Sequence, residues 1–558
     1  MYIEKINSPE DLKKLNIEQM TSLAEEMRKA LIKKLSIHGG HFGPNLGMVE
    51  TTIALHYVFD SPKDKIVFDV SHQSYCHKML TGRKDAFLYE DKYDDVSGYT
   101  NPAESKHDFF NIGHTSTSVS LASGLVKARD LKGENGNVIA VIGDGSLSGG
   151  EALEGLDFAS ELGTNFIIIV NDNDMSIAEN HGGLYKNLEQ LRNSDGKCEC
   201  NLFCSFNLDY RFVKNGNDIA SVISALEEVK DIDHPVVVHI VTQKGKGYPV
   251  AEKNKENWHW CMPFDIETGK PKFTSDDEDY GTLTSDFLLE KMKKDPLVTT
   301  IAAAVPTSIG FASGIAKAGG KPVFATHSSF IQRTFDQLSQ DLCINNNPAT
   351  IIVCTASVFG MNDVTHLGIY DIPLVSNIPD MVYLAPTSKE EYFAMLDWSI
   401  EQSDHPVAVR MPCNGVISSG EKVDSDYSDL NKYKIIQNGS RVAVIALGDF
   451  WQLGENTVKY ISENSEIKPT LINPRYITGI DEKMLENLKK EHDVVITLED
   501  GILDGGFGEK IARFYGNSDV KVLNYGLKKE FLDRYSVDEV MKENRLVPQM
   551  ILEDIQKI

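Results

Sequence analysis

Short runs of apolar residues alternate along the chain with segments whose apolar residues recur at helical spacing. The clearest case lies within residues 137–180. The apolar run 138–142 ends at a Gly-Asp-Gly turn that contains Asp144, and the run 166–170 ends at an Asn-Asp-Asn turn that contains Asn173. A strand, a crossover helix and a second strand of this length predict one βαβ unit of a parallel sheet.

The same alternation continues to the end of the sequence and is interrupted by two polar, acidic stretches, near 275–279 and 418–434. We therefore expect three domains, at 1–274, 280–415 and 435–558, each long enough for a hydrophobic core of its own. The predicted fold class is α/β, with three consecutive doubly wound domains built on mainly parallel sheets.

Two segments of the pattern are less regular. Residues 181–207 are rich in polar residues and glycine, and we expect them to be mostly loop. Residues 330–342 have the spacing of an amphipathic helix, which would carry Arg333 and follow a strand that ends at His327.

The two turns of the 137–180 segment combine residue types that suit a metal and a diphosphate. The carboxyl ends of neighbouring parallel strands meet at the edge of an open sheet where ligands bind. Asp144 and Asn173 offer oxygen ligands of the kind that Mg²⁺ prefers, and the glycines let the backbone approach a phosphate group closely. An ordinary turn would explain a lone Gly-Asp-Gly, but not its pairing with Asn-Asp-Asn about thirty residues later.

Composition and charge exclude some partners. The net charge of −26 argues against binding to nucleic acid or to an anionic membrane, because both need clustered positive charge. No run approaches eighteen apolar residues, and residues 1–15 lack the apolar core of a signal peptide. We therefore expect a cytoplasmic protein without a membrane partner. Eight cysteines do not indicate a disulfide framework, and Cys198, Cys200 and Cys204 are better explained as reduced thiols than as a metal site.

Three histidines lie on loops next to predicted elements, where functional residues concentrate. His41 follows the first long helix, His72 follows a short buried strand, and His114 precedes a helix in the sequence Gly-His-Thr-Ser-Thr-Ser. The hydroxyls of that last loop can cap the helix or receive an anion. A histidine satisfied by backbone groups in the core is an equally good explanation for His41 or His72 taken alone.

Together these motifs resemble the thiamine-diphosphate-dependent transketolase superfamily, and within it most closely the 1-deoxy-D-xylulose-5-phosphate synthases. The resemblance extends over nearly the whole chain. Its motifs are GGHFGPNLG from residue 39, DVSHQSYCHKMLTGR from 69, GHTSTS from 113, GDGSLSGG from 143, NDNDMSI from 171, KGKGY from 244, SSFIQRTFDQL from 328 and THLGIYD from 365.

The resemblance implies a transketolase-like fold, thiamine diphosphate and Mg²⁺ as cofactors, and a homodimer. It implies small-molecule substrates, namely a 2-oxo acid or ketose donor and an aldehyde acceptor, and a place in isoprenoid and thiamine biosynthesis. The implied reaction joins pyruvate to glyceraldehyde 3-phosphate with decarboxylation. A transketolase or carboligase with another donor or acceptor, and a cofactor-binding paralogue without synthase activity, are the alternatives.

The resemblance also assigns roles to individual residues. It implies that Mg²⁺ is held by Asp144, Asn173 and the backbone of Met175. The implied cofactor-binding residues are His72, Gly113, His114, Thr115, Asp144, Gly145, Ser146, Asn173, Met175, Tyr248, Val305 and Phe330. The implied catalytic histidines are His41, His259 and His366. The implied substrate-binding residues are His327, Arg333 and Arg410.

The sequence departs from the family pattern mainly in the second block. Val305 stands where the family has the glutamate that hydrogen-bonds the aminopyrimidine ring, and the segment 295–303 before it is much shorter than in the synthases. The family arginine before the glycine loop is Thr355. Loss of a positioned proton-transfer group typically costs about 10²–10⁴-fold in rate. Glyoxylate carboligases have a valine at the same place and are active, so the replacement is compatible with a working cofactor site. The loss of one of the family's two phosphate-binding arginines, by contrast, points to a changed acceptor.

We predict that Val305→Glu changes the rate of hydrogen–deuterium exchange at the thiazolium carbon of bound thiamine diphosphate, since the carboxylate would favour the tautomer that takes this proton. The exchange rate is read by NMR after acid quenching, with Val305→Leu as the control. An unchanged rate in Val305→Glu would mean that residue 305 does not occupy the place of the family glutamate.

Overall fold

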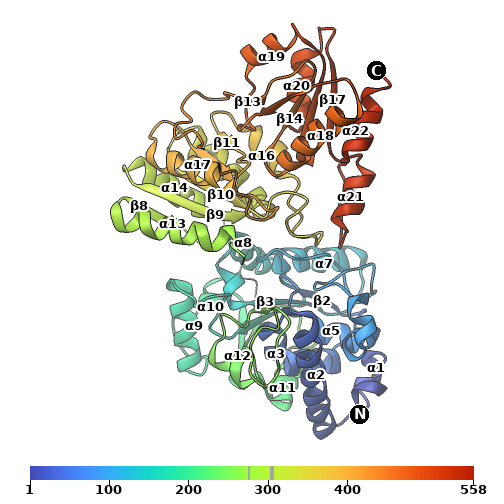
Figure 1. The fold of residues 1–558 in the computed structure, drawn as a ribbon. Coiled ribbons are helices and arrows are strands. Elements are labelled where there is room, and N and C mark those ends of the chain that lie inside the picture. Colours follow the sequence, from blue (N-terminus) through green and yellow to red (C-terminus); the bar gives the residue numbers. More distant parts are fainter. Residues whose placement is uncertain (274–276, 302–306, 421) are drawn as a thin grey trace. The chain divides into compact units, whose positions relative to one another are not determined.

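The computed structural model describes residues 1–273, 277–301, 307–420 and 422–558. The chain forms two compact units, Met1–Ser275 and Asp276–Ile558, which Figure 1 shows in colours that follow the sequence. No described helix is long and apolar enough to cross a membrane.

The first unit is built on a five-stranded parallel sheet with the order β2-β3-β4-β6-β5. Its strands are β2 (Lys65–Phe68), β3 (Val138–Gly143), β4 (Phe166–Asp172), β5 (Asp209–Val213) and β6 (Pro235–Val241). The central strands β3 and β4 are apolar along almost their whole length because both of their faces are covered. This confirms the βαβ unit predicted for residues 137–180, with α8 (Gly150–Ala159) as its crossover helix.

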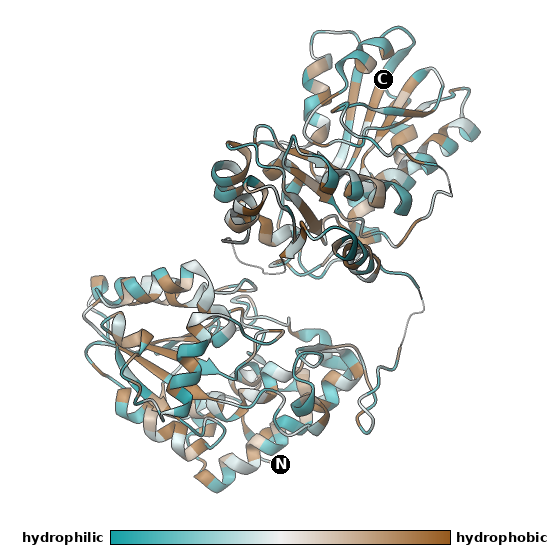
Figure 2. Cartoon of the chain, turned by 90° about the vertical axis from the view of Figure 1, so that its left-hand side faces the viewer, coloured by the Kyte–Doolittle hydropathy of each residue, from teal (hydrophilic) through white to brown (hydrophobic). Residues whose placement is uncertain are grey.

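Helices cover both faces of this sheet. Alternate residues of β3 point to opposite cores: Ile139 and Val141 pack with helices α2, α4 and α11, whereas Ala140 and Ile142 pack with α7 and α8. Figure 2 shows the apolar strands in brown between helices with hydrophilic outer faces. The helices of this unit are α1 (Pro9–Leu12), α2 (Ile17–His38), α3 (Gly43–Gly47), α4 (Val49–Val58), α5 (Tyr75–Lys78), α6 (Asp85–Leu88), α7 (Ser118–Lys132), α9 (Gly183–Asn193), α10 (Leu202–Ser205), α11 (Ile219–Val229) and α12 (Pro249–Lys253). A small antiparallel pair adds β1 (Gly40–His41) and β7 (Trp260–Cys261).

The second unit contains two further sheets. The first is parallel, in the order β11 (Val382–Leu384), β12 (Val407–Arg410), β10 (Thr350–Cys354), β9 (Lys321–His327) and β8 (Val298–Ile301). The other has the order β13 (Lys434–Gln437), β15 (Thr470–Asn473), β14 (Arg441–Ala446), β16 (His492–Ile502) and β17 (Lys521–Leu527), and only β13 is antiparallel. Their helices are α13 (Tyr280–Lys294), α14 (Thr307–Lys317), α15 (Ser328–Ile331), α16 (Asp371–Ser376), α17 (Lys389–Glu401), α18 (Trp451–Asn464), α19 (Glu482–Leu488), α20 (Phe507–Tyr515), α21 (Val537–Glu543) and α22 (Pro548–Ile555).

The two sheets of the second unit share one hydrophobic core, to which β10 contributes Ile351 and Val353 and β14 contributes Ala443 and Ile445. The fold class is therefore α/β with three mainly parallel sheets, as predicted. The predicted boundary between a second and a third domain, at 415–435, stays a prediction.

Two local expectations were wrong. Residues 181–207 are not mostly loop, because they contain α9 and α10. Residues 330–342 do not form one regular helix: α15 is followed by a 3₁₀ turn at Gln332–Thr334 and by a wider helical turn at Gln337–Cys343. Arg333 therefore lies on the 3₁₀ turn.

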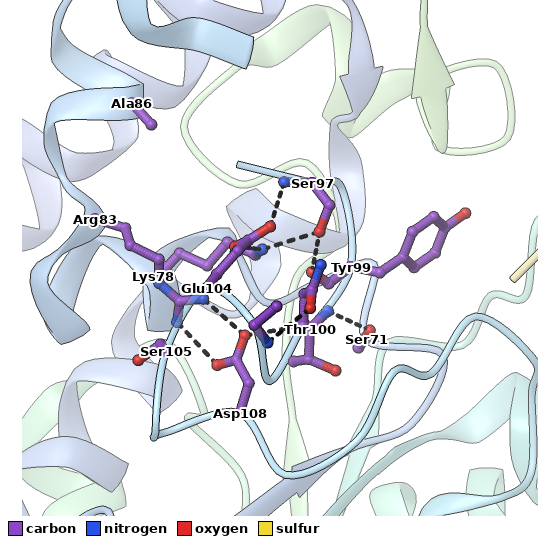
Figure 3. A network of polar contacts seen from close by, with 12 residues as sticks. Ser71, Lys78, Arg83, Ala86, Ser97, Tyr99, Thr100, Glu104, Ser105 and Asp108 are labelled. Atoms are coloured by element: carbon purple, nitrogen blue, oxygen red, sulfur yellow. Dashed lines mark hydrogen bonds and ion pairs between the residues drawn. The ribbon is translucent and has the colours of Figure 1, made fainter. Parts of the chain in front are cut away.

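A buried polar network orders the charged segment that follows α6 (Figure 3). The Lys78 ammonium contacts the Glu104 carboxylate at 2.5 Å, and the Arg83 guanidinium donates to Asp108 at 2.7 and 2.9 Å. Glu104 and Asp108 in turn accept backbone N–H groups of their own segment, from Ser97 and Asn101. The network thus holds residues 97–108 in place although they contain no regular strand or helix.

Candidate functional site

The carboxylate of Asp144, directly after β3, lies at the centre of a set of hydrogen-bond donors. Its side chain is 1% exposed. The donors are the backbone N–H groups of Gly145 at 2.9 Å, Asn173 at 3.3 Å and Met175 at 3.1 Å, and the side-chain amide of Asn180 at 3.2 Å. The turn after β4 is therefore folded onto the carboxylate at the end of β3, as the sequence pattern predicted.

The electrostatics of this carboxylate favour a cation. Burial, and then the charge of the neighbouring Asp172, raise the pKa of Asp144 to about 8. A nearby cation would offset both effects, because it stabilises the ionised form.

The oxygen of the Asn173 side-chain amide is buried and accepts no hydrogen bond from the described residues. Buried polar atoms are usually paired, so this oxygen fits a ligand that the protein itself does not supply. An amide oxygen beside a carboxylate suits Mg²⁺. No cluster of three or more His, Cys, Asp or Glu side chains that could hold a metal occurs in the described ranges, so a metal here depends on the mixed donors of Asp144, Asn173 and the backbone of Met175.

A side chain at Gly145 would require the neighbouring turn to shift. A Cβ at this position would lie 2.3 Å from the hydroxyl oxygen of Ser176, well inside contact distance. The neighbouring Ser146 accepts a hydrogen bond on its carbonyl from the hydroxyl of Ser116 at 2.8 Å. The loop after β3 is thus packed against the turn after β4 and against the loop that precedes α7.

Asp69, which follows β2, fixes the loop before α7. Its buried carboxylate accepts the backbone N–H groups of Ser116 and Ser118, each at 2.9 Å. Gly113, His114 and Thr115 lie in this loop, whose Ser116 contacts Ser146 in the loop after β3. Sequence reasoning missed Asp69, although its position directly after a buried strand was a usable signal.

Three of the predicted histidines lie together. The rings of His41 and His72 have centroids 5.0 Å apart, His72 stacks on His259 at 5.2 Å, and His41 lies 5.8 Å from His259. Pairing of β1 with β7 brings His41 and His259 together from distant parts of the chain. Burial, followed by the charge of Lys244, lowers the pKa of His259 to about 3, so its ring is neutral at pH 7.

Lys244 was not singled out from the sequence. Its side chain is buried and its ammonium donates to the carbonyl of Ser176 at 2.6 Å. Burial lowers the pKa of Lys244 to about 8. The negative charge of Asp144 has the opposite effect and raises this pKa. Tyr248, a predicted cofactor-binding residue, packs in an aromatic cluster with Phe42 and Trp258 and donates its hydroxyl to the carbonyl of Ile266.

In the second unit, Phe330 lies between two of the predicted histidines. Its ring centroid is 5.3 Å from that of His327 and 5.4 Å from that of His366. His327 lies 2.7 Å from the hydroxyl of Thr355, and burial lowers the pKa of His327. Val305 lies outside the described residues.

Comparisons with known proteins agree with this arrangement. A family model described as 1-deoxy-D-xylulose-5-phosphate synthase matches residues 3–200. Models of the transketolase pyrimidine-binding domain and the transketolase C-terminal domain match residues 281–415 and 431–551. The chain is 36% identical to the 1-deoxy-D-xylulose-5-phosphate synthase of Clostridium beijerinckii, over 100% of this chain and 99% of that protein. The chain belongs to the 1-deoxy-D-xylulose-5-phosphate synthase family.

A second family member, from Caldanaerobacter subterraneus, is 35% identical over 99% of this chain and 98% of its own length. The alignment with the Clostridium synthase runs over 617 residues, whereas this chain has 558. The chain therefore lacks segments that its relatives have. A solved transketolase from Campylobacter jejuni is 15% identical over 98% of this chain, with a TM-score of 0.41 that is too low to support an argument.

Arg410, an implied substrate-binding residue, is paired with two buried carboxylates. Its side chain is 4% exposed. Its guanidinium donates to Asp371 at 2.8 Å and to both carboxylate oxygens of Asp500 at 2.5 Å. Asp500 belongs to β16 of the neighbouring sheet, so Arg410 joins the two sheets of the second unit. A substrate phosphate would have to compete with these two carboxylates for the guanidinium, and the implied substrate-binding role of Arg410 stays a prediction.

We predict that Arg410→Leu lowers the free energy of unfolding of the second unit by about 3–5 kcal/mol, because it leaves two carboxylates buried without a counter-charge. The loss is measured by hydrogen exchange of β12 and β16 in increasing urea. Arg441→Leu is the control. The side chain of Arg441 is 68% exposed, and its Nε atom lies 3.8 Å from Oδ2 of Asp493, so this ion pair contributes little to stability. Full protection in Arg410→Leu together with lost binding of a sugar phosphate would contradict the structural role and support the substrate-binding role.

Proposed function

We propose that the protein is a thiamine-diphosphate- and Mg²⁺-dependent transferase that joins pyruvate to glyceraldehyde 3-phosphate and releases CO₂. The observation that carries this proposal concerns Asp144 and Asn173, at the ends of β3 and β4. The buried Asp144 carboxylate accepts the backbone N–H of Asn173, and the buried amide oxygen of Asn173 has no hydrogen-bond partner among the described residues. These donors suit Mg²⁺ and, through the metal, a diphosphate. Membership of the synthase family supports the choice of cofactor and substrates.

Bound thiamine diphosphate supplies the carbanion chemistry that cleaves and forms C–C bonds next to a carbonyl group. In the reaction the acetyl unit of pyruvate joins the aldehyde carbon of the acceptor, CO₂ leaves, and one proton is taken up. Asp144, Asn173 and the Met175 backbone would hold the metal. Gly145 would allow the backbone to come close to the diphosphate, and Gly113 to Thr115 lie in the adjoining loop before α7.

The histidine cluster in the first unit supplies hydrogen-bonding and proton-transfer groups. His41, His72 and His259 are close enough to act on the same small substrate. Because the ring of His259 is neutral at pH 7, it enters as a hydrogen-bonding group and not as an imidazolium acid. Phe330, His327 and His366 form the corresponding group of the second unit, and Phe330 offers an apolar ring to the aminopyrimidine.

A different acceptor is the second candidate. Two features favour it: the guanidinium of Arg410 is taken up by Asp371 and Asp500, and Thr355 replaces a family arginine. Both reduce the positive charge available to a phosphate. A carboligase or a transketolase acting on an unphosphorylated aldehyde fits these features, and a paralogue that only binds the cofactor is the third candidate. We also propose that the protein is a cytoplasmic homodimer, as the resemblance to the family implies.

The candidates are separated by product analysis. Protein saturated with thiamine diphosphate and Mg²⁺ is given ¹³C-labelled pyruvate, alone and with glyceraldehyde 3-phosphate, glyceraldehyde or glycolaldehyde, and the products are read by mass spectrometry. We expect labelled deoxyxylulose phosphate and CO₂ in equal amounts. Product only from an unphosphorylated aldehyde selects the second candidate, and tight cofactor binding without turnover selects the third.

The same assay tests the role of the histidine cluster. We predict that His259→Asn lowers kcat by about 10²–10³-fold, because it removes a positioned hydrogen-bonding group. His234→Asn is the matched control, because the side chain of His234 is 47% exposed and pairs with Asp209 and Asp233. An equal kcat in the two variants would remove His259 from the reaction.

A further inference from the structure

Arg192, on α9, forms ion pairs with the two residues that flank Asn173. Its Nη1 atom lies 2.8 Å from both carboxylate oxygens of Asp172, and its Nη2 atom lies 2.7 Å from Oδ1 of Asp174. One rigid guanidinium therefore spans Asn173, whose buried amide oxygen has no hydrogen-bond partner among the described residues.

The Asp172 side of this bridge is buried and tightly held. Asp172 is fully buried, and its Oδ2 atom also lies 2.8 Å from Nε2 of His239 on β6. The other ring nitrogen of His239 lies 2.8 Å from the hydroxyl of Tyr210 on β5. Asp174, by contrast, has a side chain that is 62% exposed. An exposed ion pair alone contributes little to stability, so the Arg192–Asp174 pair would not hold the turn by itself. Asp172 is fixed by its buried contacts, and Arg192 links Asp174 to it.

The backbone at Asp174 needs such support. Its φ of +62° is in the left-handed region, which a residue with a Cβ adopts at a cost. Its N–H donates to Oδ1 of Asp172 at 3.1 Å. This turn is what directs the N–H groups of Asn173 and Met175 to the carboxylate of Asp144.

We propose that Arg192 is a positioning residue that fixes the turn 172–175 and thereby aims the Asn173 amide oxygen at Mg²⁺. The inference rests on the proposed function, which supplies the metal. Its rival is that Arg192 only balances the charge of Asp172. The two ideas predict opposite signs: loss of a nearby positive charge alone strengthens the binding of a dication, whereas loss of the bridge weakens it.

The test is calorimetric titration of Mg²⁺ into protein saturated with thiamine diphosphate. We predict that Arg192→Gln weakens Mg²⁺ binding by about 10–100-fold, the usual effect of removing a group that orients a metal ligand. Arg192→Lys keeps the charge but lacks the forked guanidinium that reaches both carboxylates. Its Mg²⁺ affinity should therefore lie between those of wild type and Arg192→Gln. Arg211→Gln is the matched control. Arg211 pairs with Asp209 on β5, so this variant protein should bind Mg²⁺ as wild type does.

Thermal unfolding of the metal-free variants separates positioning from general stability. A merely structural role would lower the midpoint of unfolding and leave the Mg²⁺ affinity of the folded protein unchanged. Unchanged or tighter binding by Arg192→Gln, with normal binding by wild type, overturns the inference. If Arg192→Gln does not fold, Arg192→Lys decides, and wild-type affinity in that variant overturns the inference. Failure of wild type itself to bind Mg²⁺ would instead contradict the proposed function.

Discussion

The structure of the first unit depends on a carboxylate that is buried at the end of a buried strand. Removing Asp144 from water costs free energy unless other groups stabilise its charge. Part of that stabilisation comes from the N–H groups of the turn after β4, which therefore has to fold over the end of β3. Burial still raises the pKa of Asp144 to about 8, which indicates that the protein donors do not compensate fully. The arrangement is completed most simply by a cation.

Other buried acids in the first unit have the same kind of task. Asp69 holds the loop before α7, Asp172 holds the turn around Asn173 through Arg192, and Asp108 holds the segment after α6. Each places irregular backbone at or near the carboxyl ends of the sheet, where apolar packing alone cannot define a conformation. In the second unit the buried acids Asp371 and Asp500 serve a different purpose, because they and Arg410 join two sheets.

The sequence predicted the strands and the two polar turns that follow β3 and β4, because both follow from local patterns. Continuous apolar runs mark buried parallel strands, and the residues directly after them must lie at the ligand-binding edge. α9 was missed because polar residues dominate its segment. Its core-facing leucines, Leu188 and Leu191, are buried and recur at helical spacing, and they were a usable signal.

Contacts between distant residues could not be derived in this way. No local pattern shows that His41 meets His259 through the pairing of β1 with β7, or that the guanidinium of Arg410 is already used by Asp371 and Asp500. A motif identifies a residue but says nothing about its surroundings, so the two carboxylates around Arg410 could not be foreseen from its motif.

The central claim is that Asp144 is the charged ligand of a metal that carries the cofactor. It is tested most directly by measuring thiamine diphosphate binding with and without Mg²⁺ for wild type, for Asp144→Asn and for the exposed control Asp233→Asn. Asn keeps the size of the side chain and one acceptor oxygen but removes the charge. We expect Mg²⁺ to tighten cofactor binding in wild type and in the control and to have little effect in Asp144→Asn. Equal dependence on Mg²⁺ in all three proteins would contradict the claim.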